Sequence, residues 1–394
     1  MKTAIPASTF QNDSNNLNVL RSLAVLFVFV SHVLQLSYPI RGRWQLGRVG
    51  VLLFFIHTTL VLMQSLERQE KAKPGNMWAR FMIRRCFRIY PLSIVAVLVY
   101  VGLGIPEIQA LHQTFFRHLT RSGLLANLLL VQNVSGSPSV PWVLWSLPYE
   151  MQMYCVLPAL YLAAKSGGIS KLSKIFTVSL AYAFLVQILL PLRFYWLFEF
   201  IPNQLLSLLQ FVPCFVMGAI AYKIPRSNRV TSWMWPLFVC GAVLAFALFA
   251  NRDIWFQWAL CGVVGLALPH FRDLPNNFLT KAARYIAKFS YGIYLFHGAA
   301  VWFAIERLGF RPVSAGIICL AVIVPFAALA YYAIEKPFMD CGGRLRMPVL
   351  RRSPGRRVKS VPLATVASRT KSANQIGSSR SSATVCSGVT VVNP

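Results

Sequence analysis

The chain has 394 residues, of which 56% are hydrophobic and only 13% carry a charged side chain. Soluble domains carry about 25% charged residues, so this composition excludes a water-soluble protein with one ordinary core, and its hydrophobicity excludes disorder except in local segments. The 39 basic and 11 acidic residues give a net charge of +28. In a membrane protein this excess indicates basic loops that face anionic lipid, not a nucleic-acid partner.

Apolar runs along the chain are continuous and do not alternate with polar residues. Because only helices and closed barrels satisfy the backbone in lipid, such runs predict an all-α, polytopic membrane helix bundle. Taking about 17–25 apolar residues per crossing, we expect about ten transmembrane helices in the lipid bilayer. They are predicted near residues 18–38, 46–66, 90–106, 145–164, 172–191, 205–222, 233–250, 254–270, 288–305 and 314–334.

Basic residues predict the orientation of these helices. With the N-terminal segment 1–17 in the cytoplasm, the Lys and Arg clusters after every second span fall on the same side, as the positive-inside rule requires. Counting Leu124–Val131 as an eleventh span would break this pattern, and the segment is too short to cross. It is interpreted as re-entrant or interfacial. We therefore expect a multi-pass protein of the inner (cytoplasmic) membrane with both termini cytoplasmic.

The end of the chain has a different composition. No acidic residue follows Asp340, and the segment from Pro348 is rich in Ser, Thr, Val and Arg. Such a segment has too few apolar residues to fold. We expect a membrane domain over residues 18–340 and a basic, disordered tail over residues 341–394.

The first span carries Arg21 and His32. Eleven residues are almost three helical turns, so the two side chains share one face and are separated by a rise of about 16 Å. A histidine within an apolar helix is costly. It indicates either a functional group or a histidine bonded to a neighbouring helix. His57 in the second span is interpreted as a satisfied polar residue.

The fourth span opens with Trp145, Ser146 and Tyr149 and then carries Glu150. A carboxylate in an apolar helix needs a partner, and His32 is predicted to be that partner because both lie in the outer half of the expected topology. A carboxylate beside an imidazole raises its basicity and selects its tautomer, as a general base requires.

Three arginines, Arg84, Arg85 and Arg88, crowd the cytoplasmic start of the third span. Clustered guanidinium groups suit phosphate through paired hydrogen bonds, but the commoner role of juxtamembrane arginines is to anchor the topology by binding lipid phosphates. Glu335 ends the tenth span and is predicted to form a structural ion pair with Arg21 or with this cluster. His297 in the ninth span is either functional or a packing residue.

Other chemistries have no support in the sequence. The eight cysteines form no CxxC pair, so no metal site is predicted. No GxSxG, Walker or HExxH motif occurs, which leaves serine hydrolases, P-loop NTPases and zinc peptidases without a signature.

Six short motifs follow one another in the chain. They are Arg21 with His32; Gly50, Val51, Phe54 and Phe55; Arg84, Arg85, Arg88, Ile89, Tyr90 and Pro91; Trp145, Ser146, Leu147, Glu150 and Tyr154; Ser290, Tyr291, Tyr294, Leu295 and His297; and Glu335, Lys336 and Pro337. In this order they resemble the acyltransferase-3 family of bacterial integral-membrane O-acyltransferases, which decorate surface polysaccharides and other glycans. Asn18, Leu52 and the pair Thr58–Thr59 depart from the family pattern of Asp, Asp and Ser-Gly.

The resemblance implies transfer of an acyl group, most commonly acetyl, from acyl-CoA to a hydroxyl of a cell-surface or lipid-linked glycan. Acyl-CoA is then a co-substrate, and no bound cofactor is implied. The implied roles divide into donor binding by Arg21, Arg84, Arg85 and Arg88, catalysis by His32 and Glu150, and support by Trp145, Ser146, Tyr154, Tyr294, His297 and Glu335.

A transporter of a glycan precursor or small substrate is the alternative, since a helix bundle with buried His and Glu could move a substrate without making bonds. No inverted repeat supports that alternative. Transfer of labelled acetyl groups from CoA to glycan would separate the two.

Overall fold

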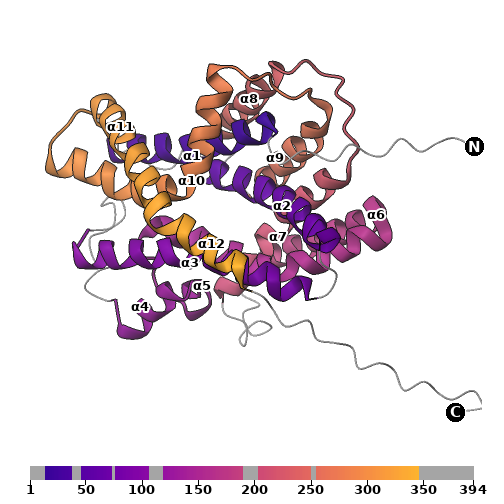
Figure 1. Ribbon diagram of the computed structural model, residues 1–394, viewed down its shortest axis with the longest axis horizontal. Helices are drawn as coiled ribbons and strands as arrows, with labels where there is room; N and C mark the ends of the chain where they lie inside the picture. The colour runs from indigo at the N-terminus through magenta and orange to yellow at the C-terminus, as the bar shows by residue number, and fades with distance from the viewer. Residues whose placement is uncertain are drawn as a thin grey trace, which may run out of the picture. The chain divides into compact units, whose positions relative to one another are not determined.

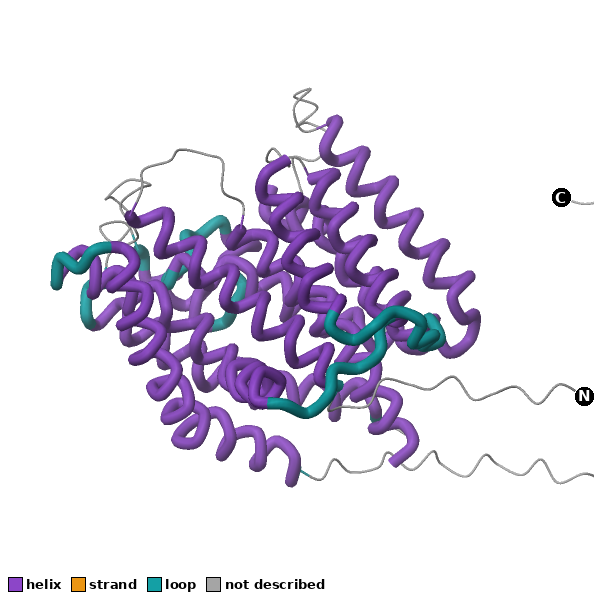
Figure 2. The backbone as a smooth tube through the Cα atoms, turned by 90° about the horizontal axis from the view of Figure 1, so that it is seen from above, coloured by secondary structure: helices purple, strands orange, loops and turns teal. Residues whose placement is uncertain are grey.

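The computed structural model describes residues 14–37, 46–72, 76–105, 119–189, 203–249 and 254–345. Within these ranges the chain contains helices and loops and no β-strand (Figure 2), apart from one isolated bridge between Val230 and Phe271. The all-α prediction is therefore confirmed for this part of the chain. The predicted tail from residue 346 onward lies outside the described residues.

The helices follow one another along the chain as Figure 1 labels them. They are α1 (Asn15–Ser37), α2 (Leu46–Ala72), α3 (Met77–Gly102), α4 (Arg121–Leu128), α5 (Gln132–Ser135), α6 (Leu147–Leu189), α7 (Asn203–Lys223), α8 (Met234–Phe249), α9 (Ile254–Ala267), α10 (Phe278–Trp302), α11 (Pro312–Ala330) and α12 (Lys336–Arg344). A 3₁₀ turn, Trp142–Ser146, leads into α6. A π-helical turn, Tyr331–Glu335, joins α11 to α12.

Five helical segments of the described residues are long and apolar enough to cross a membrane. They are Asn15–Gln35, Leu46–Ala72, Met77–Gly102, Trp142–Ile188 and Pro312–Arg344. Leu208–Lys223 and Met234–Phe246 are shorter apolar helices. The chain thus has the all-α fold of a multi-pass membrane protein, while the expected count of about ten crossings stays a prediction.

Two predicted spans have different boundaries in the structure. The third begins at Met77 and not near residue 90, because no Pro or Gly interrupts the helix before Pro91. The fourth and fifth form one run, α6, which is broken at Gly168 with φ 59° and ψ −149°. Only glycine adopts that conformation readily. The 8-residue α4 is about 12 Å long and cannot cross the bilayer, so no eleventh crossing forms there.

The predicted limits of the membrane domain at residues 18 and 340 both fall inside helices, α1 and α12. α1 begins earlier because Asp273 caps it from a distant loop. The Ser14 hydroxyl donates to this carboxylate at 2.7 Å, and the backbone N–H groups of Asn15 and Asn16 donate to it at 3.2 and 3.0 Å. A carboxylate at a helix N-terminus satisfies free N–H groups and interacts favourably with the helix dipole.

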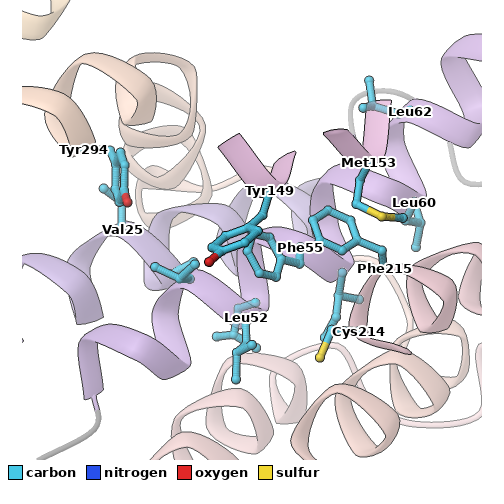
Figure 3. Packing of buried hydrophobic residues seen from close by; sticks show 14 of the residues in the cluster. Val25, Leu52, Phe55, Leu60, Leu62, Tyr149, Met153, Cys214, Phe215 and Tyr294 are labelled. Carbon is cyan, nitrogen blue, oxygen red and sulfur yellow. The ribbon is translucent and has the colours of Figure 1, made fainter. Parts of the chain in front are cut away.

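The core of the bundle is built around α2, which contacts α1, α6, α7 and α9. Glycine allows the closest approaches. A Cβ on Gly50 would lie 2.5 Å from the carbonyl oxygen of Ala24 on α1, and a Cβ on Gly218 of α7 would lie 2.7 Å from that of Ile56 on α2. Small residues at helix interfaces are what permits such contact in membranes. Figure 3 shows the side chains of α2, α6 and α7 meeting in this core.

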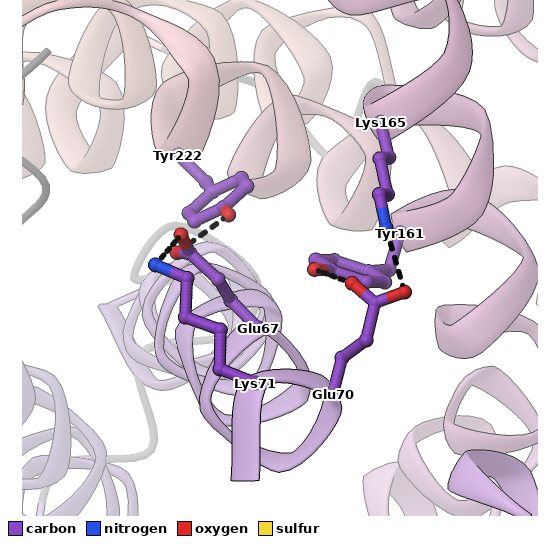
Figure 4. Close-up of polar contacts among 6 residues, drawn as sticks. All are labelled: Glu67, Glu70, Lys71, Tyr161, Lys165 and Tyr222. Atoms are coloured by element: carbon purple, nitrogen blue, oxygen red, sulfur yellow. Dashed lines mark hydrogen bonds and ion pairs between the residues drawn. The ribbon is translucent and has the colours of Figure 1, made fainter. Parts of the chain in front are cut away.

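Polar contacts hold the C-terminal end of α2 to two neighbours (Figure 4). Glu70 accepts hydrogen bonds from the hydroxyl of Tyr161 at 2.8 Å and from Lys165 at 2.7 Å, both on α6. Glu67 accepts from the hydroxyl of Tyr222 on α7 at 2.8 Å. These bonds set the position of α2 relative to α6 and α7 where its apolar contacts end.

The contact at Gly50 predicts a measurable stability effect. Gly50→Ala should lower the free energy of unfolding by about 1–3 kcal/mol, because a backbone carbonyl must move to admit the methyl group. Gly241→Ala on α8 is the matched control, since nothing lies within 4 Å of its Cβ position and alanine is favoured over glycine in a helix by about 0.5–1 kcal/mol. Thermal unfolding in detergent compares the two. Equal melting temperatures would contradict the close α1–α2 packing.

Candidate active site

α1 and α10 pack side by side, and polar contacts join them at several levels. At one level the Arg21 Nε donates to the Ser290 hydroxyl at 2.6 Å. Further along both helices, His32 Nδ1 lies 2.7 Å from His297 Nε2. The helices therefore run in the same direction, and the shared face predicted for Arg21 and His32 is directed at α10.

The two histidines form a buried pair. Their rings are nearly parallel, with centroids 4.9 Å apart and an angle of 21°, and their exposed fractions are 7% and 1%. The ring of Trp142 lies nearly perpendicular to that of His32, with centroids 4.1 Å apart. These two ring contacts restrict the orientation of the His32 side chain.

The hydrogen bonds determine which nitrogen of His32 carries a proton when both rings are neutral. His297 Nδ1 faces the carbonyl oxygen of Tyr294 at 2.8 Å, and a carbonyl only accepts, so this nitrogen carries hydrogen. His297 Nε2 is then an acceptor, and His32 Nδ1 donates to it. His32 Nε2 is left with a free lone pair, the state that a general base requires.

The free nitrogen of His32 is directed toward the start of α2 and a cavity there. A Cβ on Gly47 would lie 3.5 Å from His32 Nε2. The cavity has a volume of about 410 Å³, and we call it the histidine cavity. Its walls combine aromatic, amide and aliphatic side chains with one arginine: Val28, His32, Gln35, Gly47, Arg48, Val51, Trp142, Val143, Trp145, Tyr149, Gln210, Phe211 and Tyr294.

A second cavity, of about 90 Å³, lies at the level of Arg21, and we call it the arginine cavity. Its polar lining consists of Arg21, Thr58, Arg85, Arg88, Ser146, Glu150, Tyr154, Ser290, Tyr291 and Tyr294. Arg84 is exposed and does not line it. Successive residues of a helix are about 100° apart, so Arg85 can face the cavity while Arg84 faces away.

Two carboxylates accompany the arginines. Glu150 accepts a hydrogen bond from the Tyr154 hydroxyl at 2.6 Å. Glu335 is buried, and one of its oxygens lies 3.7 Å from Arg88 Nη2. The predicted ion pair between Glu335 and the basic cluster is therefore present, with Arg88 as its partner.

The predicted pairing of His32 with Glu150 is wrong. His32 is bonded to His297, and Glu150 lines the arginine cavity. The reason lies in the approach to α6. Trp142, not Glu150, reaches the level of His32, and Glu150 lies eight residues further on, about 12 Å along a helical path.

Sequence reasoning also missed Trp142, Tyr149 and the start of α2 as parts of the site. The sequence feature that could have indicated the start of α2 as part of the site is the pair Gly47 and Arg48 next to an apolar run. His57 was interpreted as satisfied, yet its buried Nδ1 has no hydrogen-bond partner among the described residues, and the residue lines neither cavity.

Comparison with known proteins shows which family this helix bundle belongs to. The family model for the acyltransferase-3 domain, described as an acyltransferase domain, matches residues 14–332. The chain belongs to the acyltransferase-3 family and is an acyltransferase.

Two relatives illustrate the similarity. "Nodulation protein 10" of Rhizobium leguminosarum bv. viciae is 25% identical over 365 residues, which cover 82% of this chain and 93% of that protein. The peptidoglycan O-acetyltransferase OatA of Listeria monocytogenes serovar 1/2a is 26% identical over 363 residues, which cover 82% of this chain and 55% of OatA. No solved structure matches the chain.

Removing the imidazole of His32 should remove most of the acyltransferase activity. His32→Ala should lower the rate of acyl transfer by about 10²–10⁴-fold, the usual contribution of a general base, while the protein still accumulates in the membrane. His270→Ala is the control, because His270 is exposed and lines neither cavity. Acyl transfer at the wild-type rate in His32→Ala membranes would remove the catalytic assignment.

The tautomer argument predicts a graded effect at His297. His297→Ala should lower kcat more than it changes KM, because His32 Nδ1 loses its acceptor and the ring can adopt the other tautomer. His297→Gln offers an amide oxygen as a new acceptor and should recover part of the lost kcat. Steady-state kinetics of both variants checks this order, and equal kcat values would contradict it.

Proposed function

We propose that the protein is an inner-membrane O-acetyltransferase that moves an acetyl group from acetyl-CoA to a hydroxyl of a cell-surface or lipid-linked glycan. The observation that carries the proposal is the pair of cavities. One gathers three guanidinium groups, and the other contains a histidine with a free nitrogen. The name of the Listeria relative, a peptidoglycan O-acetyltransferase, supports a glycan acceptor.

The donor is assigned to the arginine cavity. CoA carries several phosphate charges, and Arg21, Arg85 and Arg88 converge there from α1 and α3. Hydrogen bonds between guanidinium and phosphate are charge-assisted and often paired, which makes them short and directional. Glu335 holds Arg88 in place through their 3.7 Å contact. In the predicted topology these arginines lie on the basic, cytoplasmic side of the membrane, together with both termini. The donor therefore enters from the cytoplasm.

The acceptor is assigned to the histidine cavity. Trp145, Tyr149 and Phe211 offer aromatic faces, while Gln35 and Gln210 offer amide groups. Ligand sites typically combine a mainly apolar wall with a few polar groups that orient the ligand. A sugar ring matches this lining, since its C–H faces are apolar and its hydroxyl groups exchange hydrogen bonds with amides.

The reaction then follows from the state of His32. Its Nε2 takes the proton of the acceptor hydroxyl while that oxygen attacks the carbonyl carbon of the thioester. The new C–O bond forms, the C–S bond breaks, and the leaving thiolate takes the proton back from the imidazolium. His297 keeps its hydrogen bond to His32 Nδ1 throughout and stabilises the transient positive charge.

Labelled acetyl transfer tests the function directly. Membranes that contain the protein should move radiolabel from acetyl-CoA to glycan, and membranes that contain His32→Ala should not. Uptake of a glycan precursor without any covalent label would instead favour the transporter.

The donor assignment predicts an asymmetric effect of the arginines. Replacing both Arg85 and Arg88 by Gln should raise KM for acetyl-CoA more than tenfold, since charged hydrogen bonds contribute about 1.5–3 kcal/mol each and about 1.4 kcal/mol is tenfold in affinity. Lys replacements should restore only part of the affinity, because an ammonium lacks the paired geometry.

Arg84→Gln is the matched control for this experiment. It removes a neighbouring charge on the same helix without touching the cavity, so KM for acetyl-CoA should stay near the wild-type value. Cysteine accessibility verifies that each variant is correctly oriented. A normal KM in a correctly oriented double variant would exclude these arginines from donor binding.

A further inference from the structure

Two residues line both the arginine cavity and the histidine cavity, namely Val51 of α2 and Tyr294 of α10. They stand where the two spaces meet. Val51 is one turn along α2 from Gly47 at the His32 nitrogen, and three residues before Phe54, whose ring lies 5.9 Å from the Arg21 guanidinium carbon. α2 thus has one face that runs from one cavity to the other, with Val51 midway.

α10 forms the opposite wall in the same order. Ser290 bonds to Arg21 at one end, His297 bonds to His32 at the other, and Tyr294 lies between them. Seven residues of helix rise about 10 Å. Helices α2 and α10 therefore both place a side chain between the arginine level and the histidine level.

Tyr294 is held firmly in this position. Its hydroxyl donates to the carbonyl oxygen of Val143 and lies 2.8 Å from the Ser146 hydroxyl, both on the 3₁₀ turn before α6. Its ring packs edge-on against Phe54, with centroids 6.2 Å apart. Val51 has an exposed fraction of only 4%. The wall between the cavities is a bonded tyrosine ring beside a buried valine, not a flexible side chain.

This wall has a consequence that rests on the proposed function. The donor phosphates are assigned to one cavity and the catalytic nitrogen lies in the other, about 10 Å further along α10. The acyl thioester must therefore pass between Val51 and Tyr294 to reach His32. We propose that these two side chains form the passage for the acyl-bearing arm of the donor and select the acyl group by size, admitting acetyl and excluding longer chains.

The acyl-length profile of the wild-type protein and of widened variants tests the passage. The measurement is kcat/KM for acetyl-, propionyl- and butyryl-CoA with the full chain in membranes. Val51→Ala should raise the ratio of butyryl to acetyl transfer about tenfold, the usual discrimination for one or two methyl-sized groups in a fitted site. Val61→Ala is the matched control, because Val61 is on the same helix and lines the arginine cavity alone. Its ratio should equal that of the wild type.

A second pair of variants tests the wall without removing core volume. Tyr294→Phe releases the ring from Val143 and Ser146, so it should shift the profile toward longer chains, by less than Val51→Ala. Tyr291→Phe is its control. The Tyr291 hydroxyl donates to the carbonyl oxygen of Ile89 at 2.7 Å, and this residue lines the arginine cavity alone.

Narrowing the passage should give the opposite result. Val51→Leu should lower kcat for acetyl-CoA while equilibrium binding of CoA stays near the wild-type affinity, because the arginines are unchanged. A block in transfer with intact donor binding is not expected from a merely destabilised protein.

The outcomes separate the two proposals. Wild-type protein that transfers no acyl group from any CoA donor would overturn the proposed function and the passage with it. The passage alone would be overturned if the wild type transfers acetyl but the widened variants behave like their controls. In that case Val51→Ala and Tyr294→Phe have the same acyl-length profiles as Val61→Ala and Tyr291→Phe. If Val51→Ala fails to accumulate in the membrane, the acyl-length profiles of Tyr294→Phe and Tyr291→Phe alone test the passage.

Discussion

The hydrogen bond between His32 and His297 is the interaction on which the site depends. It exists only because α1 and α10 run side by side in the same direction, and it leads to a definite protonation state only because the Tyr294 carbonyl occupies the far nitrogen of His297. The pair lies in a buried position where a free polar group is costly. One ring nitrogen of His32 is hydrogen-bonded, and the other is left without a partner beside a cavity. Close packing alone would not produce this arrangement.

A second constraint is the approach of α1 to α2. Gly50 lets the two backbones come close, and Gly47 one turn earlier leaves room in front of the His32 nitrogen. A larger residue at Gly47 would fill space in the histidine cavity, and one at Gly50 would push α1 and α2 apart. The same close packing leaves Val51 as one side of the narrow wall between the cavities, so bundle stability and the shape of the passage depend on the same helix face.

Charges in this bundle are gathered at defined places. Three arginines, Glu150 and three tyrosines line the arginine cavity, whereas the histidine cavity is lined by one arginine and by aromatic, amide and aliphatic groups. Buried charges need partners, and Glu335 supplies one to Arg88. The remaining positive charge of that cavity suits an anionic ligand, while the other cavity suits a neutral, partly apolar one. Separate sites for donor and acceptor follow from this division.

Much of this protein can be read from its amino-acid order, because the relevant rules are local. Composition and continuous apolar runs imply a helical membrane protein, and the spacing from Arg21 to His32 puts both on one helix face since α-helices have 3.6 residues per turn. Which side chains meet across helices depends on how far each helix is shifted along its axis, and no local pattern encodes that shift. The 3₁₀ turn before α6 brings Trp142 to His32 and carries Glu150 down to the arginines. The partner of His32, the exclusion of Arg84 and the wall formed by Val51 and Tyr294 were consequently settled by packing between helices alone.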